Sequence, residues 1–365
     1  MEVSEKFLNF MLSIIFIIAA SSCKTESPAT PVASFPTTLY TRTVNYQENA
    51  SSFSIVQLTD LHIGTSANFT ASYDHPTPPP AGSDGIEADY LRNIVLWINN
   101  NIDTNNIKFV IVSGDITDSG SLWQFVKAKE ILDQLTIPYI PMMGNHDVWP
   151  KGSSSIASTP IGDSYFRDVF GAVFTALKTN PMFSPIWDDG TRNTPVTNPS
   201  YPCDNYYQNF YFSYEGYSFL LNDFNARYLF NVEYEGVIYY TGAGVKGELT
   251  YTWDNWFQTK YNSLSKDNKD RILIFNHIPA ISWSHPTTGV QYGFESSDLS
   301  QITDFLYNTD NYNDTGLWAG GHLHTQTAYD YYINVYTPTY QVGCPQIVAQ
   351  TAQEGKIQLI TLYNN

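Results

Sequence analysis

The sequence predicts an α/β protein in which strands and helices alternate along the chain. Three observations support this prediction. Short apolar runs of strand length each stop at a cluster of polar residues, and amphipathic helical patterns lie between these runs. The chain has 365 residues, of which 42% are hydrophobic, so it can bury a large core. In open α/β sheets functional groups gather beyond the carboxyl ends of the strands, so we expect the polar clusters to meet there.

Five apolar runs are predicted as strands, because each is about as long as a strand and stops at a turn signal or a polar residue. In chain order they are FSIVQLTDLH (53–62), KFVIVSGDITD (108–118), IPYIPMMGNHD (137–147), RILIFNH (271–277) and GLWAGGHLH (316–324). The stretch 206–241 is dense in Tyr and Phe and shows a two-residue alternation. This alternation predicts added antiparallel strands, and therefore mixed rather than purely parallel sheets.

Apolar residues at three- and four-residue spacing predict four helices between the strands. They cover residues 85–100, 121–135, 250–264 and 298–307. The segment 150–209 is loop-rich by comparison, and we expect it to overhang the site and to select the substrate.

The N-terminus differs in composition from the rest of the chain. Lys6 precedes an apolar stretch over 7–20, small residues and Cys23, so we interpret residues 1–22 as a secretory signal peptide. The run Ala-Ser-Ser-Cys at 20–23 resembles the lipobox of bacterial lipoproteins, in which the cysteine is lipidated, and ordinary signal cleavage nearby is the alternative. Residues 23–41, rich in Ser, Thr and Pro, are predicted to be a tether, and 42–365 the folded domain. We expect an exported protein, anchored to a bacterial membrane as a lipoprotein or otherwise secreted.

Charge and cysteine content limit the possible partners. The formal net charge is −17, from 35 acidic and 18 basic residues, which argues against general attraction to nucleic acid or anionic membranes. We therefore expect membrane contact only through a lipid anchor at Cys23, and nothing in the sequence predicts an oligomeric state. Cys203 and Cys344 could pair in an oxidising compartment, although two cysteines far apart in sequence do not establish a bridge.

The histidines are concentrated at the ends of the predicted strands. Five of the seven lie in the polar clusters, namely His62, His146, His277, His322 and His324. Along an extended chain residues i and i+2 point the same way, so His322 and His324 can face one site, and so can Asp60 and His62. Imidazoles, carboxylates and the amide oxygen of Asn145, without cysteine, suit divalent ions such as Mn, Fe or Zn.

The order of these clusters resembles one enzyme family, the calcineurin-like metallophosphoesterases. The motifs that carry the resemblance are DLH at 60–62, GDITD at 114–118, GNHD at 144–147, His277 in FNHIP, and GHLH at 321–324. They span nearly the whole predicted domain without a gap. The resemblance implies an α/β/β/α sandwich of two mixed sheets flanked by helices, with two divalent metal ions, Mn, Fe or Zn, at the sheet edges.

The resemblance also implies a role for each motif residue. The implied ligand sets are Asp60, His62, Asp115 and His324 for one metal, and Asp115, Asn145, His277 and His322 for the other. Asp115 would bridge the two ions, which together activate a water for attack on phosphorus. His146 would protonate the leaving alkoxide, oriented by a hydrogen bond from Asp118.

Three of these residues also have simpler interpretations. Asp118 could cap the helix that follows it. Asn145 could serve only a tight turn, and His277 could be a hydrogen-bonded core histidine.

The predicted function is metal-dependent hydrolysis of a small-molecule or lipid phosphate ester. Protein phosphatases usually carry Arg-Gly after the second motif, and GDITDSGS lacks it. The stretches QLTDLHIG and NHIP are more similar to bacterial and sphingomyelinase-like phosphodiesterases, so we favour a phosphodiesterase. The alternatives are a phosphomonoesterase or nucleotidase, and a non-catalytic surface lipoprotein that uses the same scaffold to bind a partner. The complete set of motif ligands favours an enzyme.

Overall fold

The computed structural model describes residues 37–364, apart from 70, 149–161, 184–185, 198–203, 228–229, 235–236, 242–245, 250, 265–270, 283–291, 309–314, 325–328 and 337–340. Residues Phe35–Asn365 form one compact unit. The predicted signal peptide, Cys23 and Cys203 lie outside the described residues, so the lipid anchor and the disulfide stay predictions. Within the described part of the chain, no helix is both long enough and apolar enough to cross a membrane.

Two mixed sheets form the middle of the fold. The five-stranded sheet has the order β1-β16-β2-β3-β4, and the seven-stranded sheet has the order β14-β15-β13-β12-β9-β8-β5. The first sheet consists of β1 (Thr38–Val44), β2 (Ser52–Leu58), β3 (Ile107–Ser113), β4 (Tyr139–Met142) and β16 (Lys356–Tyr363). The second consists of β5 (Trp187–Asp188), β8 (Phe210–Tyr214), β9 (Tyr217–Leu221), β12 (Ile272–Phe275), β13 (Thr315–Gly320), β14 (Tyr329–Tyr336) and β15 (Gln341–Val348).

Both sheets combine parallel and antiparallel pairs. Strands β2, β3 and β4 run parallel, as do β9, β12, β13 and β15 in the other sheet. Antiparallel partners flank them, since β16 pairs with β2, β14 with β15, and β8 with β9. Two short antiparallel hairpins lie outside these sheets, β6 (Val196–Thr197) with β7 (Asp204–Asn205) and β10 (Phe230–Tyr234) with β11 (Val237–Thr241). The prediction of mixed sheets is therefore confirmed.

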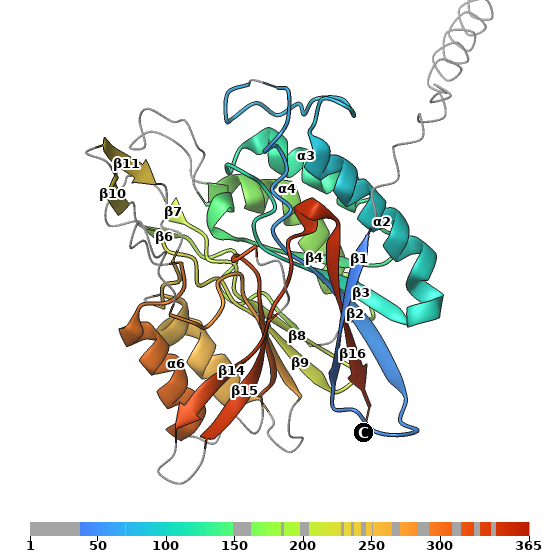
Figure 1. Ribbon diagram of the computed structural model, residues 1–365, viewed down its shortest axis with the longest axis vertical. Coiled ribbons are helices and arrows are strands. Elements are labelled where there is room, and N and C mark those ends of the chain that lie inside the picture. The colour runs from blue at the N-terminus through green and yellow to red at the C-terminus, as the bar shows by residue number, and fades with distance from the viewer. Residues whose placement is uncertain are drawn as a thin grey trace, which may run out of the picture. The chain divides into compact units, whose positions relative to one another are not determined.

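Helices cover the outer face of each sheet. Figure 1 shows α2 (Ile86–Asn105), α3 (Leu122–Leu132) and α4 (Gly162–Thr179) beside the five-stranded sheet, and α6 (Ser296–Asn308) beside the seven-stranded one. A π-helix (Trp253–Phe257) continues directly into α5 (Gln258–Ser263), and both lie within the predicted helix 250–264. The α/β/β/α sandwich is thus confirmed.

Aromatic side chains fill the space between the two sheets. Phe109 of β3 packs against Phe212, Tyr214 and Phe219 of the opposite sheet, with ring centroids 5.6, 5.7 and 5.4 Å away. Successive side chains of a strand point to opposite faces, so Leu220, next to Phe219, belongs to a second core with the π-helix, α5 and α6. Each central strand of the second sheet is therefore buried on both faces.

Two predicted boundaries differ from the structure. Residues 162–179, predicted as loop, form α4, because Phe166, Phe170 and Phe174 recur at four-residue spacing and are fully buried. The predicted tether extends four residues too far, since Thr38–Val44 form β1 and pair in parallel with β16. Thr, Leu and Tyr at these positions suit a strand.

Candidate metal centre

The five polar clusters follow the carboxyl ends of parallel strands. In the first sheet Asp60 and His62 follow β2, Asp115 follows β3, and Asn145 follows β4. In the second sheet His277 follows β12, while His322 and His324 follow β13. Because β2, β3 and β4 run parallel, as do β12 and β13, the carboxyl ends of these strands lie at one edge of each sheet, as expected for a site in an open α/β sheet. The structure brings all seven of these side chains together.

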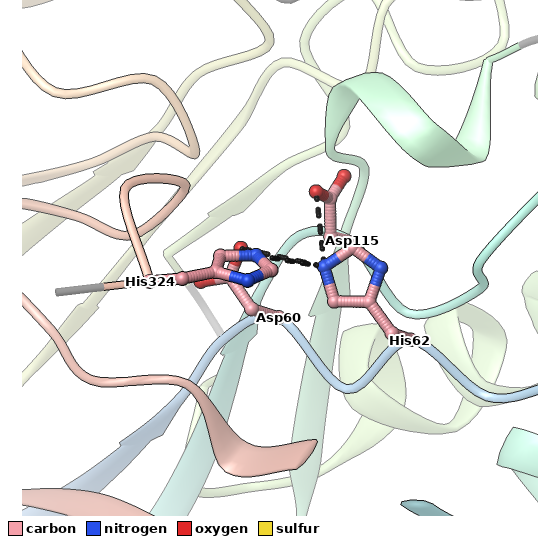
Figure 2. Close-up of side chains that lie close together, drawn as sticks. All are labelled: Asp60, His62, Asp115 and His324. Carbon is pink, nitrogen blue, oxygen red and sulfur yellow. Dashed lines mark hydrogen bonds and ion pairs between the residues drawn. The ribbon is translucent and has the colours of Figure 1, made fainter. Parts of the chain in front are cut away.

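Figure 2 shows one group of four side chains, Asp60, His62, Asp115 and His324, each with a potential ligand atom within 4.8 Å of the others. Nε2 of His324 lies 2.9 Å from Nε2 of His62 and 3.0 Å from Oδ1 of Asp60. Nε2 of His62 lies 3.7 Å from Oδ2 of Asp115. The imidazole nitrogens and carboxylate oxygens therefore converge on one small volume.

A second group shares Asp115 with the first. Potential ligand atoms of Asp115, His277 and His322 lie within 4.8 Å of one another. Nε2 of His277 is 3.1 Å from Oδ2 of Asp115 and 3.2 Å from the amide oxygen of Asn145. Nδ1 of His277 donates to the carbonyl of Ser113 at 3.0 Å, so its Nε2 keeps a lone pair toward the group when the ring is neutral. One carboxylate, that of Asp115, joins the two groups.

Left-handed backbone places most of these side chains. Of the described residues, nine that are not glycine have a positive φ, and five of the nine belong to the two groups, namely Asp60, His62, Asp115, His322 and His324. Such backbone costs of order 1–3 kcal/mol per residue and concentrates at functional sites. Asp60 and His62 face one site as expected, but the backbone that places them is left-handed rather than extended. His322 and His324 enter the two groups separately, as the ligand sets implied by the resemblance require.

Hydrogen bonds between the strand-end loops hold this backbone. The N–H of Asp60 donates to the carbonyl of Gly114 at 3.0 Å, and that of His62 donates to the carbonyl of Asp115 at 3.0 Å. The carboxylate of Asp60 in turn accepts the N–H of His322, at 3.0 Å to Oδ2. Loops from both sheets are therefore tied to one another at the groups themselves.

The two groups attract positive charge. Burial raises the pKa of Asp115, but the imidazoles of His277 and His146 outweigh burial and hold it well below its usual range. Burial lowers the pKa of His277, yet the carboxylates of Asp115 and Asp60 raise it to about 9. Burial, together with the charge of His277, lowers the pKa of His322 to about 3. A protonated His277 thus partly balances carboxylates that are buried away from water.

The sequence profile of calcineurin-like phosphoesterases matches residues 53–326. The chain belongs to this family. No curated protein matches it significantly in sequence. Family membership makes this metallophosphoesterase a hydrolase of phosphoric ester bonds, whose substrate is a phosphate ester.

Several solved structures are similar to this metallophosphoesterase in fold. A dimetal phosphatase from Danio rerio is 14% identical, with a TM-score of 0.45 over 83% of this chain and 88% of that one. A purple acid phosphatase from yellow lupin is 12% identical, with a TM-score of 0.39 over 87% of this chain and 45% of that one. The phosphopantetheinyl hydrolase of Mycobacterium tuberculosis is 11% identical, with a TM-score of 0.42 over 84% of this chain and 92% of that one.

The residues of this metallophosphoesterase fit the two divalent metal ions that its family uses. Among the described residues, Nε2 of His322 is buried without a hydrogen-bond partner, whereas Oδ2 of Asp115 is paired with Nε2 of His277 at 3.1 Å. Buried polar atoms are rarely left without a partner, and the lone pair of His322 Nε2 can coordinate a cation. The Nε2 atoms of His62 and His324 lie at hydrogen-bond distance, 2.9 Å, so they share a proton that a cation in the first group would replace.

His146 lies beside the first group without belonging to either ligand set. Its ring centroid is 4.6 Å from that of His62, and its main-chain N–H donates to Oδ1 of Asp115 at 2.8 Å. Nδ1 of His146 donates to the main-chain carbonyl of Asp118 at 2.7 Å. The carboxylate of Asp118 lies 3.9 Å from Nδ1 of His62. Asp118 does not cap α3, whose N-cap is Ser121.

Asp147, the last residue of GNHD, is a functional residue that the sequence reasoning did not assign. Its buried carboxylate accepts N–H groups of Gly144, Ile116 and Thr117, at 2.9, 3.0 and 2.8 Å. Burial, and the nearby charge of Asp115, raise its pKa to about 7. Asp147 thereby fastens the loop of Asn145 to the loop of Asp115, and the family motif itself was the signal for it.

Arg227, which the sequence reasoning left out of the site, is a structural residue. It is 1% exposed, and its guanidinium pairs with Asp163 at 3.0 Å and Asp223 at 2.6 Å. His285, the next histidine in the chain after His277, lies outside the described residues.

Gly144→Ala should disrupt the centre, because a Cβ there would stand 2.2 Å from the backbone nitrogen and Oδ1 of Asp115. We expect a loss of about 1–3 kcal/mol in the free energy of unfolding and a lower metal content, measured by denaturation and elemental analysis. Gly171→Ala in α4 is the matched control, since its Cβ would meet nothing within 4 Å. A Gly144→Ala protein with wild-type stability and metal content would contradict this account.

Proposed function

We propose that the enzyme is a phosphodiesterase in which one metal is held by Asp60, His62, Asp115 and His324, and the other by Asp115, Asn145, His277 and His322. The observation that supports these ligand sets is the pair of side-chain groups that share Asp115. When bound, two metal ions so placed would hold the phosphoryl group and lower the pKa of the water that attacks phosphorus.

His146 is the proton donor to the leaving group in this proposal. Its Nδ1 hydrogen is engaged by a carbonyl oxygen, which can only accept, so Nε2 is the atom that exchanges a proton with the substrate. The N–H of the same residue donates to Asp115. The carbonyl of Asp118 therefore orients the ring of His146, and the main chain of His146 is tied to the shared ligand Asp115. An alkoxide leaves poorly near neutral pH unless it is protonated.

The charges around the site favour a diester over a monoester. In the described part of the chain, the strongest electrostatic influences on Asp60, Asp115, His62 and His322 come from histidine and aspartate side chains, with no Lys or Arg among them. A phosphate monoester carries −1.5 to −2 charge near pH 7, while a diester carries one negative charge. The monoanion needs less help from cationic side chains beyond the metals, and this supports the phosphodiesterase proposal.

The buried cations elsewhere in the described residues already have acidic partners. Lys127 lies 3.5 Å from Asp84, whose carboxylate also pairs with the half-buried Arg92, and Arg192 lies 3.5 Å from Asp189. Arg227 is held between Asp163 and Asp223. These side chains therefore stabilise the scaffold.

Comparison of a diester with a monoester of the same alcohol tests this preference. With Mn²⁺ added, kcat/KM for bis(p-nitrophenyl) phosphate should exceed that for p-nitrophenyl phosphate by about 10-fold or more, which is ~1.4 kcal/mol of transition-state stabilisation. Asp115→Asn is the control, because it removes the shared ligand and should lose most of both the bound metal and the activity. Equal rates, or faster hydrolysis of the monoester, would count against a phosphodiesterase.

His146→Gln should keep the metal content nearly intact and slow turnover of alkyl esters by roughly 10²–10⁴-fold, the usual contribution of a general acid. Nitrophenyl esters should be much less affected, because a nitrophenolate leaves without protonation. Asp118→Asn should have a weaker effect, since the carbonyl that contacts Nδ1 of His146 survives the substitution.

His75→Gln is the matched control for this experiment, because Nδ1 of His75 contacts the carbonyl of Thr77 in a turn outside both groups. If His146→Gln slows both kinds of ester equally, His146 does not act on the leaving group. Loss of metal from the variant would show that it is a ligand.

We also propose that the enzyme is exported and anchored to a membrane by a lipid on Cys23, which follows the lipobox-like Ala-Ser-Ser at 20–22. Cys23→Ala should shift the protein from the membrane fraction to the soluble exported fraction, as judged by fractionation and immunoblotting. Ser22→Ala, which keeps the cysteine, is the control. An unchanged distribution of Cys23→Ala, or a mature protein that begins elsewhere, would refute the anchor.

A further inference from the structure

His324 is the outermost side chain of the first group and has a partner outside the motifs. Its side chain is 35% exposed, whereas those of Asp60, His62 and Asp115 are 0, 4 and 1% exposed. Nδ1 of His324 lies 3.2 Å from the side-chain amide of Gln353. Gln353 comes after residue 326, where the match to the family profile ends, so the family motifs assign it no role.

The position of Gln353 is fixed by the loop that carries the first ligands. Gln353 belongs to a short 3₁₀ turn, Ala352–Glu354, between β15 and β16. The N–H of Ala352 donates to the carbonyl of Thr59 at 2.9 Å, and the N–H of Gln353 donates to the carbonyl of Asp60 at 3.1 Å. The hydroxyl of Thr351 donates to the same carbonyl of Asp60 at 3.0 Å. The turn is therefore hydrogen-bonded to the loop that carries Asp60, and this places the side chain of Gln353 within hydrogen-bond distance of His324.

The amide of Gln353 suits both states of the His324 ring. An imidazole that gives its Nε2 lone pair to a cation carries its hydrogen on Nδ1, so the partner at Nδ1 must then accept. A glutamine amide offers an acceptor oxygen as well as a donor nitrogen, and a half-turn of the amide exchanges them. Gln353 can accordingly donate to Nδ1 without metal and accept from it when Nε2 is a ligand.

We propose that Gln353 is a positioning residue for the first metal: its amide oxygen accepts the Nδ1 hydrogen of His324 and so aims Nε2 at the ion. This inference rests on the ligand sets proposed above. Removal of a hydrogen-bond partner behind a ligand histidine typically lowers metal affinity about 10–100-fold. The effect should fall on the metal of the Asp60 group and should leave the His277 group unchanged.

Titration of the metal-free full chain with Mn²⁺ alone tests this inference by calorimetry. Gln353→Met, which is similar in length but a poor acceptor, should weaken one of the two Mn²⁺ sites about 10–100-fold. Gln353→Glu should restore wild-type affinity or improve it, because a carboxylate accepts the Nδ1 hydrogen. Glu354→Gln is the matched control, since Glu354 lies in the same turn and pairs with Lys356 at 2.6 Å. It should bind Mn²⁺ as the wild type does.

A double-mutant comparison separates positioning from support of the turn. If Gln353 acts through His324, Gln353→Met should have no further effect on Mn²⁺ affinity in a His324→Ala background. An equal loss in both backgrounds, or the same loss from Glu354→Gln, would overturn the inference. If the wild type binds two Mn²⁺ ions and Gln353→Met leaves both affinities unchanged, only the inference about Gln353 is overturned. If the wild-type chain binds no Mn²⁺, the proposed function is overturned as well.

Discussion

The structure depends on keeping two carboxylates, Asp60 and Asp115, charged inside the protein. They are 0 and 1% exposed, and burying a charge is costly unless it is paired and hydrogen-bonded. Main-chain donors meet part of this need, since His146 N–H reaches Asp115 and His322 N–H reaches Asp60. The imidazoles of the site contribute further stabilisation, and the two metal ions that the family uses would add positive charge. The left-handed backbone is tolerated because it aims these donors and ligands at the same two carboxylates.

Much of the fold and of the candidate site could be predicted because both leave a periodic or ordered pattern in the sequence. Alternating apolar runs and helical faces predicted the strands and helices that flank the site, and the order of the motifs predicted the two-sheet sandwich. Segments that follow a weaker pattern were missed. Helix α4 was not predicted because the segment around it is rich in Gly, Pro and Ser, although Phe166, Phe170 and Phe174 follow a helical periodicity.

The geometry within the site could not be predicted for a physical reason. Propensity describes ordinary backbone, whereas a positive φ at Asp60 or His62 is stable because hydrogen bonds to the loop after another strand hold it. The same applies to the hydrogen-bond acceptor for His146. The resemblance implied a hydrogen bond between Asp118 and His146, and in the structure the main-chain carbonyl of Asp118 makes this contact at Nδ1. Contacts between strand ends thus decide details that no local pattern records.

The two sheets must also keep a fixed position relative to each other, since each supplies some of the ligands. Aromatic packing around Phe109 joins the sheets, but apolar contact is not directional and does not by itself set a position to a fraction of an ångström. The hydrogen bonds of the buried Gln57 side-chain amide in β2, in contrast, are directional. The amide donates to the hydroxyl of Ser113 at 2.9 Å and to the carbonyl of Gly320 at 3.1 Å. Ser113 and Gly320 end the strands that carry Asp115 and His322, so this bond aligns the two ligand-bearing edges directly. The aromatic core therefore provides the association of the sheets, and Gln57 provides the alignment that a two-metal site requires.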